Sequence, residues 1–295
     1  MNPTVLVTGA TGFLGSHLVK GLLLEGYRVA ILKRSFSKTW RIDEVIDQVI
    51  SFDLDCMSLQ DIFGSLGKVD VVIHAATCYG RNNESYTEIL EANVVFPLKL
   101  LEAAIFFNTD TFFNTDIVLS SYLKAYSTSK KHFQDWGKQF AQKQVIKFVN
   151  LKLEHIFGAG DDDSKFITYI IKNCLSNVNE LNLTKGEQKR DFIHIDDVVS
   201  IYQILLEKVK EKTDFYQEYP VGSGKAIAIR ELVDMIHRLT QSKTILRFGA
   251  LPYREGEVMF SEAQLDALNL GGWFPKSNLE QSLKQTIVQY QRGIF

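Results

Sequence analysis

The chain has 295 residues, 45% of them hydrophobic and 23% charged, an ordinary composition for a globular protein with a sizeable core. Its formal net charge of -2, without a concentrated basic stripe, argues against nucleic acid or an anionic membrane surface as the main partner. No long apolar run or cleavable leader is evident, so we expect a cytoplasmic protein. Three cysteines and six histidines, without metal or redox spacing, predict buried reduced thiols and no metal site.

Residues 4–15 are expected to form a buried strand, a glycine turn and the start of a helix near Phe13. Glycines let the backbone turn tightly and approach a ligand, and a helix N-terminus points unpaired N–H groups at an anion. A purely structural turn is the alternative for the glycine spacing alone. Because the turn lies in a βαβ pattern, we favour a site for the pyrophosphate of a dinucleotide. The contacts predicted here are Gly9, Thr11, Gly12, Phe13 and Leu14.

The end of the second predicted strand, Val29–Leu32, is where such a site selects its cofactor. An NAD site normally places a carboxylate about 20 residues beyond the glycines, whereas an NADP site uses an arginine for the 2′-phosphate. This chain has Arg34, flanked by Lys33 and Ser35, and no carboxylate is expected to oppose them. A solvated surface arginine is the alternative. The pattern favours NADP(H), with NAD(H) as the second choice.

The next strands are predicted at residues 48–52, 69–76 and 111–115, with a helix that Asn93 opens between the last two. Strands that alternate with helices predict an α/β fold, a doubly wound parallel sheet of the Rossmann type. The small side chains that follow the fourth strand let the backbone meet a cofactor. Further cofactor contacts are expected at Asp53, Leu54, Ala75, Ala76, Thr77 and Asn93.

Thr115 ends the fifth predicted strand, and Tyr126 and Lys130 follow on the next helix. Positions i and i+4 share a helix face, and a nearby ammonium would lower the pKa of the phenol toward working pH. Such a phenol is a general acid or base for an alcohol or ketone. A solvated helix pair is the alternative. We predict that all three residues are catalytic and that Tyr126 and Lys130 also contact the cofactor.

The segments Thr8–Gly15 and His74–Thr77, with Asn93, Tyr126 and Lys130, resemble the extended short-chain dehydrogenase/reductases. This is the NAD-dependent epimerase/dehydratase family, a group of nucleotide-sugar epimerases, dehydratases and reductases. The likeness covers the whole chain, and its later segments are residues 147–158, 186–198, 219–224, 254–257 and 270–275.

The resemblance implies a division of labour within the chain. Residues 1–152, plus about 193–221, would form the dinucleotide-binding domain, and residues 153–192 and 222–295 the sugar-nucleotide lobe. In the family's pattern Arg190 and Arg254 match arginines that hold the diphosphate, and Glu257 matches a carboxylate that meets the nucleotide ribose. The substrate contacts implied in this way are Tyr79, Arg81, Asp116, His155, Lys165, Arg190, Arg254 and Glu257.

Departures from the family pattern narrow the expected reaction. Ile117 stands where the dehydratases for 4,6-elimination carry a glutamate, so dehydration is not expected. Only ten residues separate Thr115 from Tyr126, which implies a pared-back rim around the active site. His155 replaces the family's usual asparagine and Lys152 its usual arginine, which puts the direct transfer of those two contacts in doubt.

Among subgroups, residues 112–116, 126–131 and 153–158 are most similar to the CDP-abequose and CDP-paratose synthases. Those enzymes reduce the C4 ketone of a CDP-linked 4-keto-3,6-dideoxyglucose in O-antigen, and hence lipopolysaccharide, biosynthesis. We therefore expect an NADPH-dependent 4-ketoreductase of a nucleotide sugar. The alternatives are an epimerase that keeps NAD bound, and a cofactor-binding protein without catalysis. Apolar helices near residues 93–107 and 122–141 could pair in a homodimer.

Overall fold

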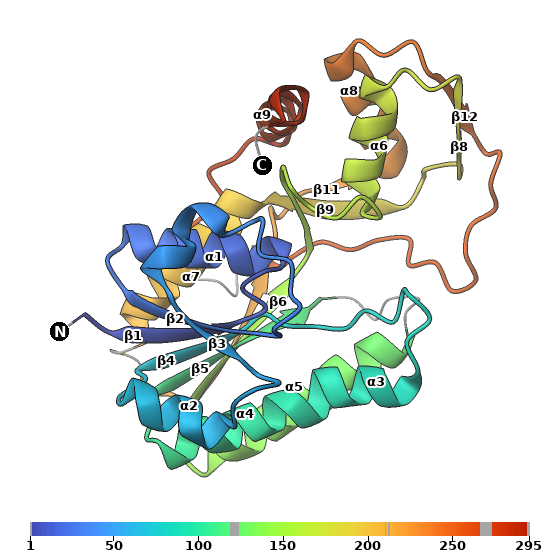
Figure 1. Ribbon diagram of the computed structural model, residues 1–295. Helices are drawn as coiled ribbons and strands as arrows, with labels where there is room; N and C mark the ends of the chain where they lie inside the picture. The colour runs from blue at the N-terminus through green and yellow to red at the C-terminus, as the bar shows by residue number, and fades with distance from the viewer. Residues whose placement is uncertain (1, 119–123, 210, 212, 266–272, 294–295) are drawn as a thin grey trace. The chain divides into compact units, whose positions relative to one another are not determined.

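In the computed structural model (Figure 1), which describes residues 2–118, 124–209, 211, 213–265 and 273–293, the chain forms two compact units. The first comprises Met1–Lys152 and Val199–Tyr219, and the second Leu153–Val198 and Pro220–Phe295. The second unit thus keeps residues 193–198, which we expected in the first. The reason is that strand β9 runs on to His194 and pairs with two strands of the second unit.

The first unit is built on a seven-stranded sheet with the order β10-β6-β5-β4-β1-β2-β3. Strand β1 is parallel to β2 and β4, β2 to β3, and β4 to β5. The strand order reverses between β1 and β4, and such a switch point is where open α/β sheets bind their ligands. The predicted doubly wound fold is confirmed. The strands are β1 Thr4–Thr8, β2 Arg28–Lys33, β3 Ile50–Asp53, β4 Val71–His74, β5 Thr111–Ile117, β6 Lys147–Leu153 and β10 Tyr216–Val221.

Helices cover both faces of this sheet, with α1 on one face and α2, α4 and α5 on the other (Figure 1). The second of these layers is filled by aromatic side chains. The rings of Phe112 and Phe148 stack 5.7 Å apart, and Phe133 packs edge-on against both. All three side chains are fully buried, and a fully buried phenylalanine contributes about 1.5–3 kcal/mol to the stability of the fold. The helices are α1 Phe13–Leu24, α2 Leu59–Leu66, α3 Tyr86–Leu90, α4 Phe96–Phe106, α5 Lys124–Gln142 and α7 Ile195–Lys208, with a 3-10 turn at Asp43–Gln48.

The helix expected to open at Asn93 begins earlier, so that prediction is wrong. Ser85 caps α3, and the side chains of Ser85 and Glu88 form a reciprocal capping box. The chain then continues through a π-helical turn at Glu91–Val95 into α4. A π-helical turn widens a helix locally and is frequent at functional sites. Asn93 lies inside that turn, with its side chain buried.

The second unit contains a three-stranded sheet of order β11-β9-β7, in which β9 is parallel to β7 and antiparallel to β11. Strands β8 and β12 form a separate parallel pair in this unit. The core of this unit includes Ile170, Leu232, Val233, Ile236 and Leu283. The elements are β7 His155–Phe157, α6 Phe166–Leu175, β8 Glu180–Leu183, β9 Lys189–His194, β11 Ala226–Ala228, α8 Ile229–Thr240, β12 Ile245–Phe248 and α9 Leu279–Arg292.

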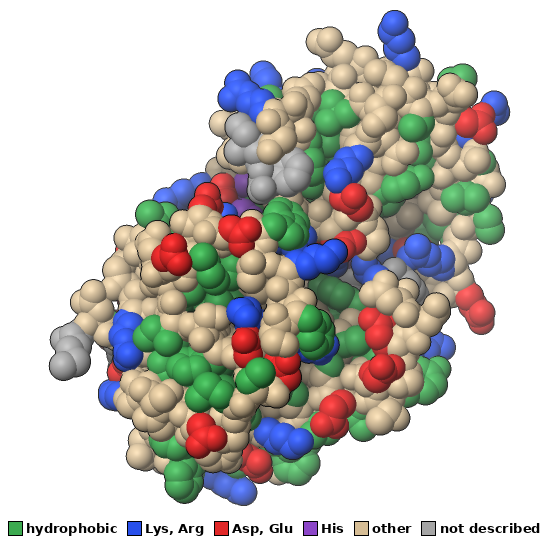
Figure 2. All heavy atoms as spheres, in the orientation of Figure 1, with side chains coloured by type: hydrophobic (Ala, Val, Ile, Leu, Met, Phe, Trp, Pro, Cys, Tyr) green, Lys and Arg blue, Asp and Glu red, His purple; other side chains and the backbone are tan. Residues whose placement is uncertain are grey.

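No helix within the described residues is long and apolar enough to cross a membrane. Figure 2 shows basic and acidic side chains interspersed on the face that it presents. The family-like segment at residues 270–275 lies partly outside the described residues, since 270–272 are not among them.

Candidate active site

The glycine turn after β1 packs against the chain that follows β4. Gly9 has a φ of +70°, and a Cβ there would lie 2.6 Å from the backbone nitrogen of Ala76. A Cβ on Gly15 would lie 2.0 Å from the Gly9 carbonyl oxygen. Neither position has room for a side chain. The turn is closed by the Gly12 N–H, which donates to the Gly9 carbonyl at 2.9 Å.

The turn and the start of α1 fit the pyrophosphate of a dinucleotide. Gly12 is the N-cap of α1 and is exposed, and no side chain caps the first turn. The N–H groups at this end therefore remain available to an anion, which the helix dipole also favours. Leu14 is buried, so a ligand would meet its backbone alone, while Phe13 turns its ring to His17, 5.1 Å away. Thr11 points its carbonyl at Arg41, whose Nη1 lies 3.4 Å away.

Carboxylates face the end of β2, and this corrects the expectation that none would oppose the basic residues there. Lys33 forms an ion pair with Asp53, because β2 and β3 align these two residues in parallel register. The Ser35 N–H donates to Asp55 at 2.8 Å, and this bonding lowers the pKa of Asp55. Arg34 remains exposed, with its guanidinium 5.7 Å from the Phe36 ring centre. Leu54 contributes a backbone N–H to the Lys33 carbonyl at 2.8 Å.

Arg41 is a basic residue near this site that the sequence reasoning missed. Its guanidinium stacks 4.2 Å from the Trp40 ring centre and reaches the glycine turn through the Thr11 carbonyl. The sequence does show Arg41 as a second arginine after β2, and this could have marked it as a candidate for the site. However, its approach to Thr11 spans 30 residues and could not be foreseen.

A buried histidine ties the carboxyl ends of β1 and β4 together. His74 Nδ1 lies 2.8 Å from the Thr8 hydroxyl, which also accepts from the Ala76 N–H at 3.4 Å. Burial holds the pKa of His74 well below its ordinary 6.5, and the positive charge of Lys130 adds to that effect. The imidazole is therefore neutral, and it positions the chain at Ala75 and Ala76 against Gly9. The rings around it are Phe96, Phe112 and Phe133.

Asn93 connects the loop after β4 to the helix that carries Tyr126. Its Oδ1 accepts from the Cys78 N–H at 2.8 Å and from the Thr77 hydroxyl at 3.2 Å. Its Nδ2 donates to the Cys78 carbonyl at 2.8 Å and to Ser129 Oγ at 3.0 Å. Ser129 in turn donates to the Tyr126 carbonyl at 2.8 Å. Both atoms of the amide are thus engaged within the protein, and Asn93 acts by positioning Thr77 and Tyr126.

Tyr126 is buried, with 5% of its surface exposed, and the expected lowering of its pKa is wrong for this structure. Burial raises the pKa of the phenol well above its ordinary 10.0, and Tyr79 and Asp116 raise it further. A hydrogen bond with Thr77 and the charge of Arg81 oppose this rise without offsetting it. The phenol therefore keeps its proton across the neutral range.

Lys130 is fully enclosed on the same helix. Its burial lowers the pKa of the ammonium from the ordinary 10.5, while the negative charge of Asp116 partly restores it. Tyr126 and Lys130 lie one turn apart on α5, as expected, but burial rather than the ammonium dominates the pKa of Tyr126.

Thr115 meets a residue that no sequence pattern indicated. Its hydroxyl lies 2.7 Å from the hydroxyl of Tyr202, which comes from α7 and is fully buried. Burial raises the pKa of Tyr202, so that partner stays neutral. The contact joins residues 87 positions apart in the chain, which explains why no local sequence pattern indicated it.

Asp116, which we expected at the substrate, is engaged inside the first unit. Asn150 Nδ2 donates to its Oδ2 at 2.9 Å, and the Ile117 N–H donates to its Oδ1 at 2.8 Å. Asn150 also lies 3.3 Å from Glu218, whose other oxygen pairs with Lys152 at 2.7 Å. Burial alone would raise the pKa of Glu218, but the hydrogen bonds from Lys152 and its neighbours lower it.

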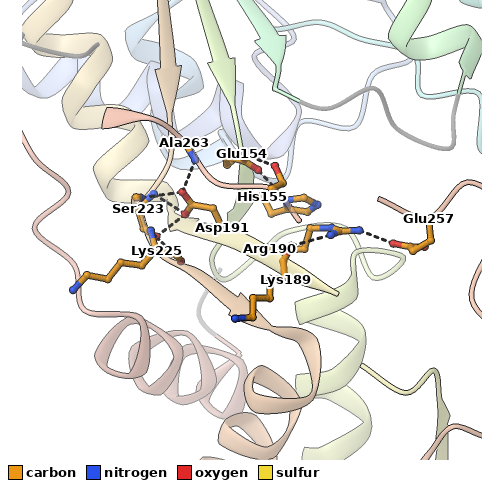
Figure 3. Close-up of polar contacts among 11 residues, drawn as sticks. Glu154, His155, Lys189, Arg190, Asp191, Ser223, Lys225, Glu257 and Ala263 are labelled. Atoms are coloured by element: carbon orange, nitrogen blue, oxygen red, sulfur yellow. Dashed lines mark hydrogen bonds and ion pairs between the residues drawn. The ribbon is translucent and has the colours of Figure 1, made fainter. Parts of the chain in front are cut away.

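In the second unit, the side chains of two predicted substrate residues, Arg190 and Glu257, come together (Figure 3). Arg190 Nη2 lies 2.6 Å from Glu257 Oε1, and both side chains are largely buried. The Glu257 N–H donates to the Arg254 carbonyl at 3.1 Å, which closes a turn between these two residues. The Arg254 side chain is exposed. Lys165 lies earlier in the chain, at the N-cap of α6.

His155 has a buried acidic neighbour in the same unit (Figure 3). Glu154 Oε2 lies 3.4 Å from His155 Nδ1, and neither atom has a hydrogen-bond partner. The other oxygen of Glu154 accepts from Ser261 Oγ at 2.5 Å. The His155 ring packs against Phe192, 5.5 Å between centres, across the β7–β9 pair.

Asp191, next to Arg190, organises the loops around this cluster. Its two oxygens accept the N–H groups of Ser223, Gly224 and Ala263 at 2.7–3.1 Å (Figure 3). A Cβ on Gly222 would lie 2.4 Å from Asp191 Oδ2, so glycine is needed there. Asp191 therefore fixes the loop positions beside β9.

Among the described residues, no cluster of three His, Cys, Asp or Glu side chains could hold a metal ion. The three cysteines are free. Cys174 is buried and Cys78 is half-buried, but Cys56 is exposed, which corrects the expectation of buried thiols.

Comparison with known proteins agrees with the fold. The sequence model of the NAD dependent epimerase/dehydratase family matches residues 5–222. CDP-abequose synthase of Salmonella muenchen is 34% identical over 294 residues, covering 97% of this chain and 98% of that protein. CDP-abequose synthase of Salmonella typhimurium is 35% identical, covering 95% and 97%. The UDP-N-acetylglucosamine 4-epimerase structure from Methanobrevibacter ruminantium superposes with a TM-score of 0.86 at 21% identity, covering 99% of each chain.

A Rossmann-type sheet with a glycine turn at its switch point is the class of fold that binds dinucleotides. The family match and the relatives at more than 30% identity place the protein more narrowly. The chain belongs to the NAD dependent epimerase/dehydratase family.

Proposed function

We propose that the protein is an NADPH-dependent reductase of the C4 ketone of a CDP-linked 4-keto-3,6-dideoxy sugar. The observation that carries the proposal is the buried, protonated Tyr126 beside Lys130, in a chain 34–35% identical to two CDP-abequose synthases. A reduction needs a proton donor at the carbonyl oxygen, and a phenol that is protonated at neutral pH can supply one.

Three residues of the first unit have different roles in the proposed reduction. When bound, NADPH supplies the hydride that C4 accepts. Tyr126 donates its phenolic proton to the ketone oxygen, which neutralises the charge that develops there. Lys130 stabilises the phenolate left behind and holds the nicotinamide ribose. Thr115, whose hydroxyl is backed by Tyr202 at 2.7 Å, orients the carbonyl.

Selection of NADP(H) over NAD(H) depends on Arg34 in this proposal. Lys33 and Ser35 already have carboxylate partners, so Arg34 provides the charge for a 2′-phosphate. Arg41, at the Thr11 carbonyl, is a second cation on the same side of the glycine turn. The proposed site therefore has two arginines and a neutralised lysine.

We assign the nucleotide sugar to the second unit. Arg190 and Arg254 would bind the diphosphate, since a guanidinium fits phosphate in a bidentate manner. In the ligand-free protein Arg190 is neutralised by Glu257, so substrate binding would exchange or share that ion pair. Glu257, released from Arg190, would then accept from the nucleotide ribose. Cytidine as the base is supported by the similarity to the two CDP-abequose synthases.

We also propose that the protein forms a homodimer through the outer faces of α3 and α5. Tyr86 on α3 is 82% exposed and Leu90 is 45% exposed, while Trp136 on α5 is 41% exposed. Apolar side chains on adjacent helices are costly to leave in water. Light scattering of the wild type should give the mass of two chains and Leu90→Asp the mass of one; a monomeric wild type contradicts this proposal.

One experiment tests the proposed reaction and its substrate together. NADPH oxidation is measured with CDP-, dTDP-, GDP- and UDP-linked 4-keto sugars, and the CDP-linked 3,6-dideoxy substrate should react fastest. An epimerase would instead retain NAD through purification and interconvert C4 epimers without net oxidation. A protein that binds cofactor but consumes none with any of these sugars would favour the non-catalytic alternative.

A further inference from the structure

The loop after β4 lays two side chains in a row over Tyr126. The Tyr79 ring centre lies 4.9 Å from that of Tyr126, at an interplanar angle of 46°. The guanidinium carbon of Arg81 lies 4.9 Å from the centre of the Tyr79 ring. Arg81 is exposed, Tyr79 is half-buried and Tyr126 is buried. The three side chains therefore form a column that runs from solvent to the phenol.

The backbone of this loop is held at several points. Asn93 binds both the N–H and the carbonyl of Cys78, the residue before Tyr79. Gly80 has a φ of +69°, and a Cβ there would lie 2.6 Å from the Ile89 side chain on α3. The loop is thus fitted closely between the π-helical turn and α3. Its conformation directs Tyr79 onto Tyr126.

We propose that Tyr79, braced from outside by Arg81, is a positioning residue that covers Tyr126 and keeps water away from its hydroxyl. The inference deepens the proposed function, on which it rests for the role of Tyr126 as the acid. A covered phenol cannot pass its proton to bulk water, and its anion has few water molecules to stabilise it. The ring of Tyr79 thereby reserves the proton of Tyr126 for the substrate.

The charges around Tyr126 agree with this role. Asp116, from β5, opposes ionisation of the phenol, and Arg81 favours it. Thr77 hydrogen-bonds to the phenol from the same loop, and Lys130 lies one helical turn away on α5. Desolvation is nevertheless the largest influence on the pKa of Tyr126. Loss of the Tyr79 ring should therefore lower that pKa, because water would reach the phenolate.

The test is a spectroscopic pH titration of Tyr126 without cofactor or substrate. The phenolate absorbance of the wild type minus that of Tyr126→Phe isolates one tyrosine among 11. The same subtraction is made in the Tyr79→Ala background, against the double variant. The midpoint should fall by about one pH unit in Tyr79→Ala, a part of the shift of several units that full burial produces. Tyr79→Phe, which keeps the ring but removes the charge that Tyr79 can carry, should lower the midpoint by clearly less than Tyr79→Ala does.

Tyr169→Ala is the matched control, since it removes an exposed tyrosine from α6, in the second unit, and should leave the midpoint unchanged. Circular dichroism at each pH identifies the range in which every variant is folded. An unchanged midpoint in folded Tyr79→Ala overturns the inference, as does an equal shift in Tyr79→Phe. Because no turnover is measured, a failed reductase assay with the expected titration would reject the proposed function alone.

Discussion

The cofactor choice can be tested by two substitutions that should act in opposite directions. In Arg34→Ala the proposed 2′-phosphate site loses its unpaired charge, whereas in Asp53→Asn the ammonium of Lys33 loses its counter-ion and becomes available to phosphate. The first change should lower the preference for NADPH over NADH. The second should raise it.

The expected changes in cofactor preference follow from how exposed the charged side chains are. A hydrogen bond to a charged group contributes about 1.5–3 kcal/mol, and the lower end applies to the exposed Arg34. At about 1.4 kcal/mol for each factor of ten, Arg34→Ala should reduce the selectivity about tenfold. The Lys33 and Asp53 side chains are 15% and 35% exposed, so release of Lys33 should be worth less, about 0.5–1 kcal/mol or a few-fold.

The assay is the ratio of kcat/KM for NADPH to kcat/KM for NADH in each protein. Lys38→Ala is the matched control, because it removes a positive charge from an exposed position in the same segment. Its ratio should equal that of the wild type. Equal ratios in the wild type and Arg34→Ala would refute the assignment of the 2′-phosphate to this strand end.

Three further outcomes are expected. Arg254→Ala should weaken binding of CDP about tenfold in calorimetry and leave NADPH affinity unchanged. Tyr202→Phe should lower kcat several-fold without changing cofactor binding, because Thr115 loses the hydroxyl that orients it. Glu218 has a pKa below its ordinary 4.5 in the folded protein, so its stabilising effect is present above that pH and is lost as the pH falls through the lower folded value. Urea unfolding of Glu218→Gln should therefore show a loss of about 1 kcal/mol at pH 7 that shrinks below pH 4.

The local parts of the fold were predictable from sequence. Strand β2, Arg28–Lys33, extends the predicted Val29–Leu32 by one residue at each end, and α1 begins at the predicted Phe13. Both follow from short-range signals, an apolar β-branched run and a glycine turn before an amphipathic stretch. The helix start at Asn93 failed because Asn is a common N-cap, but here its amide binds Cys78 and Ser129 inside a π-helical turn.

The electrostatics of the site were less predictable, because they depend on residues that are distant in sequence. Sequence spacing placed Lys130 one turn from Tyr126 and suggested a lowered pKa. The fold adds Tyr79 and near-complete burial of the phenol, and this desolvation reverses the direction of the pKa shift. Likewise, Lys33 was expected to be available, but the parallel register of β2 and β3 brings Asp53 beside it.

The role of Tyr126 as the acid is tested most directly by the turnover of Tyr126→Phe with NADPH and the CDP-linked 4-keto-3,6-dideoxy sugar. Phenylalanine keeps the ring that packs against Tyr79 and removes only the proton donor. We expect kcat to fall about 10²- to 10⁴-fold while NADPH binding and the unfolding midpoint stay at wild-type values. Turnover near the wild-type rate would show that another group protonates the ketone oxygen and would refute the role of Tyr126 as the acid.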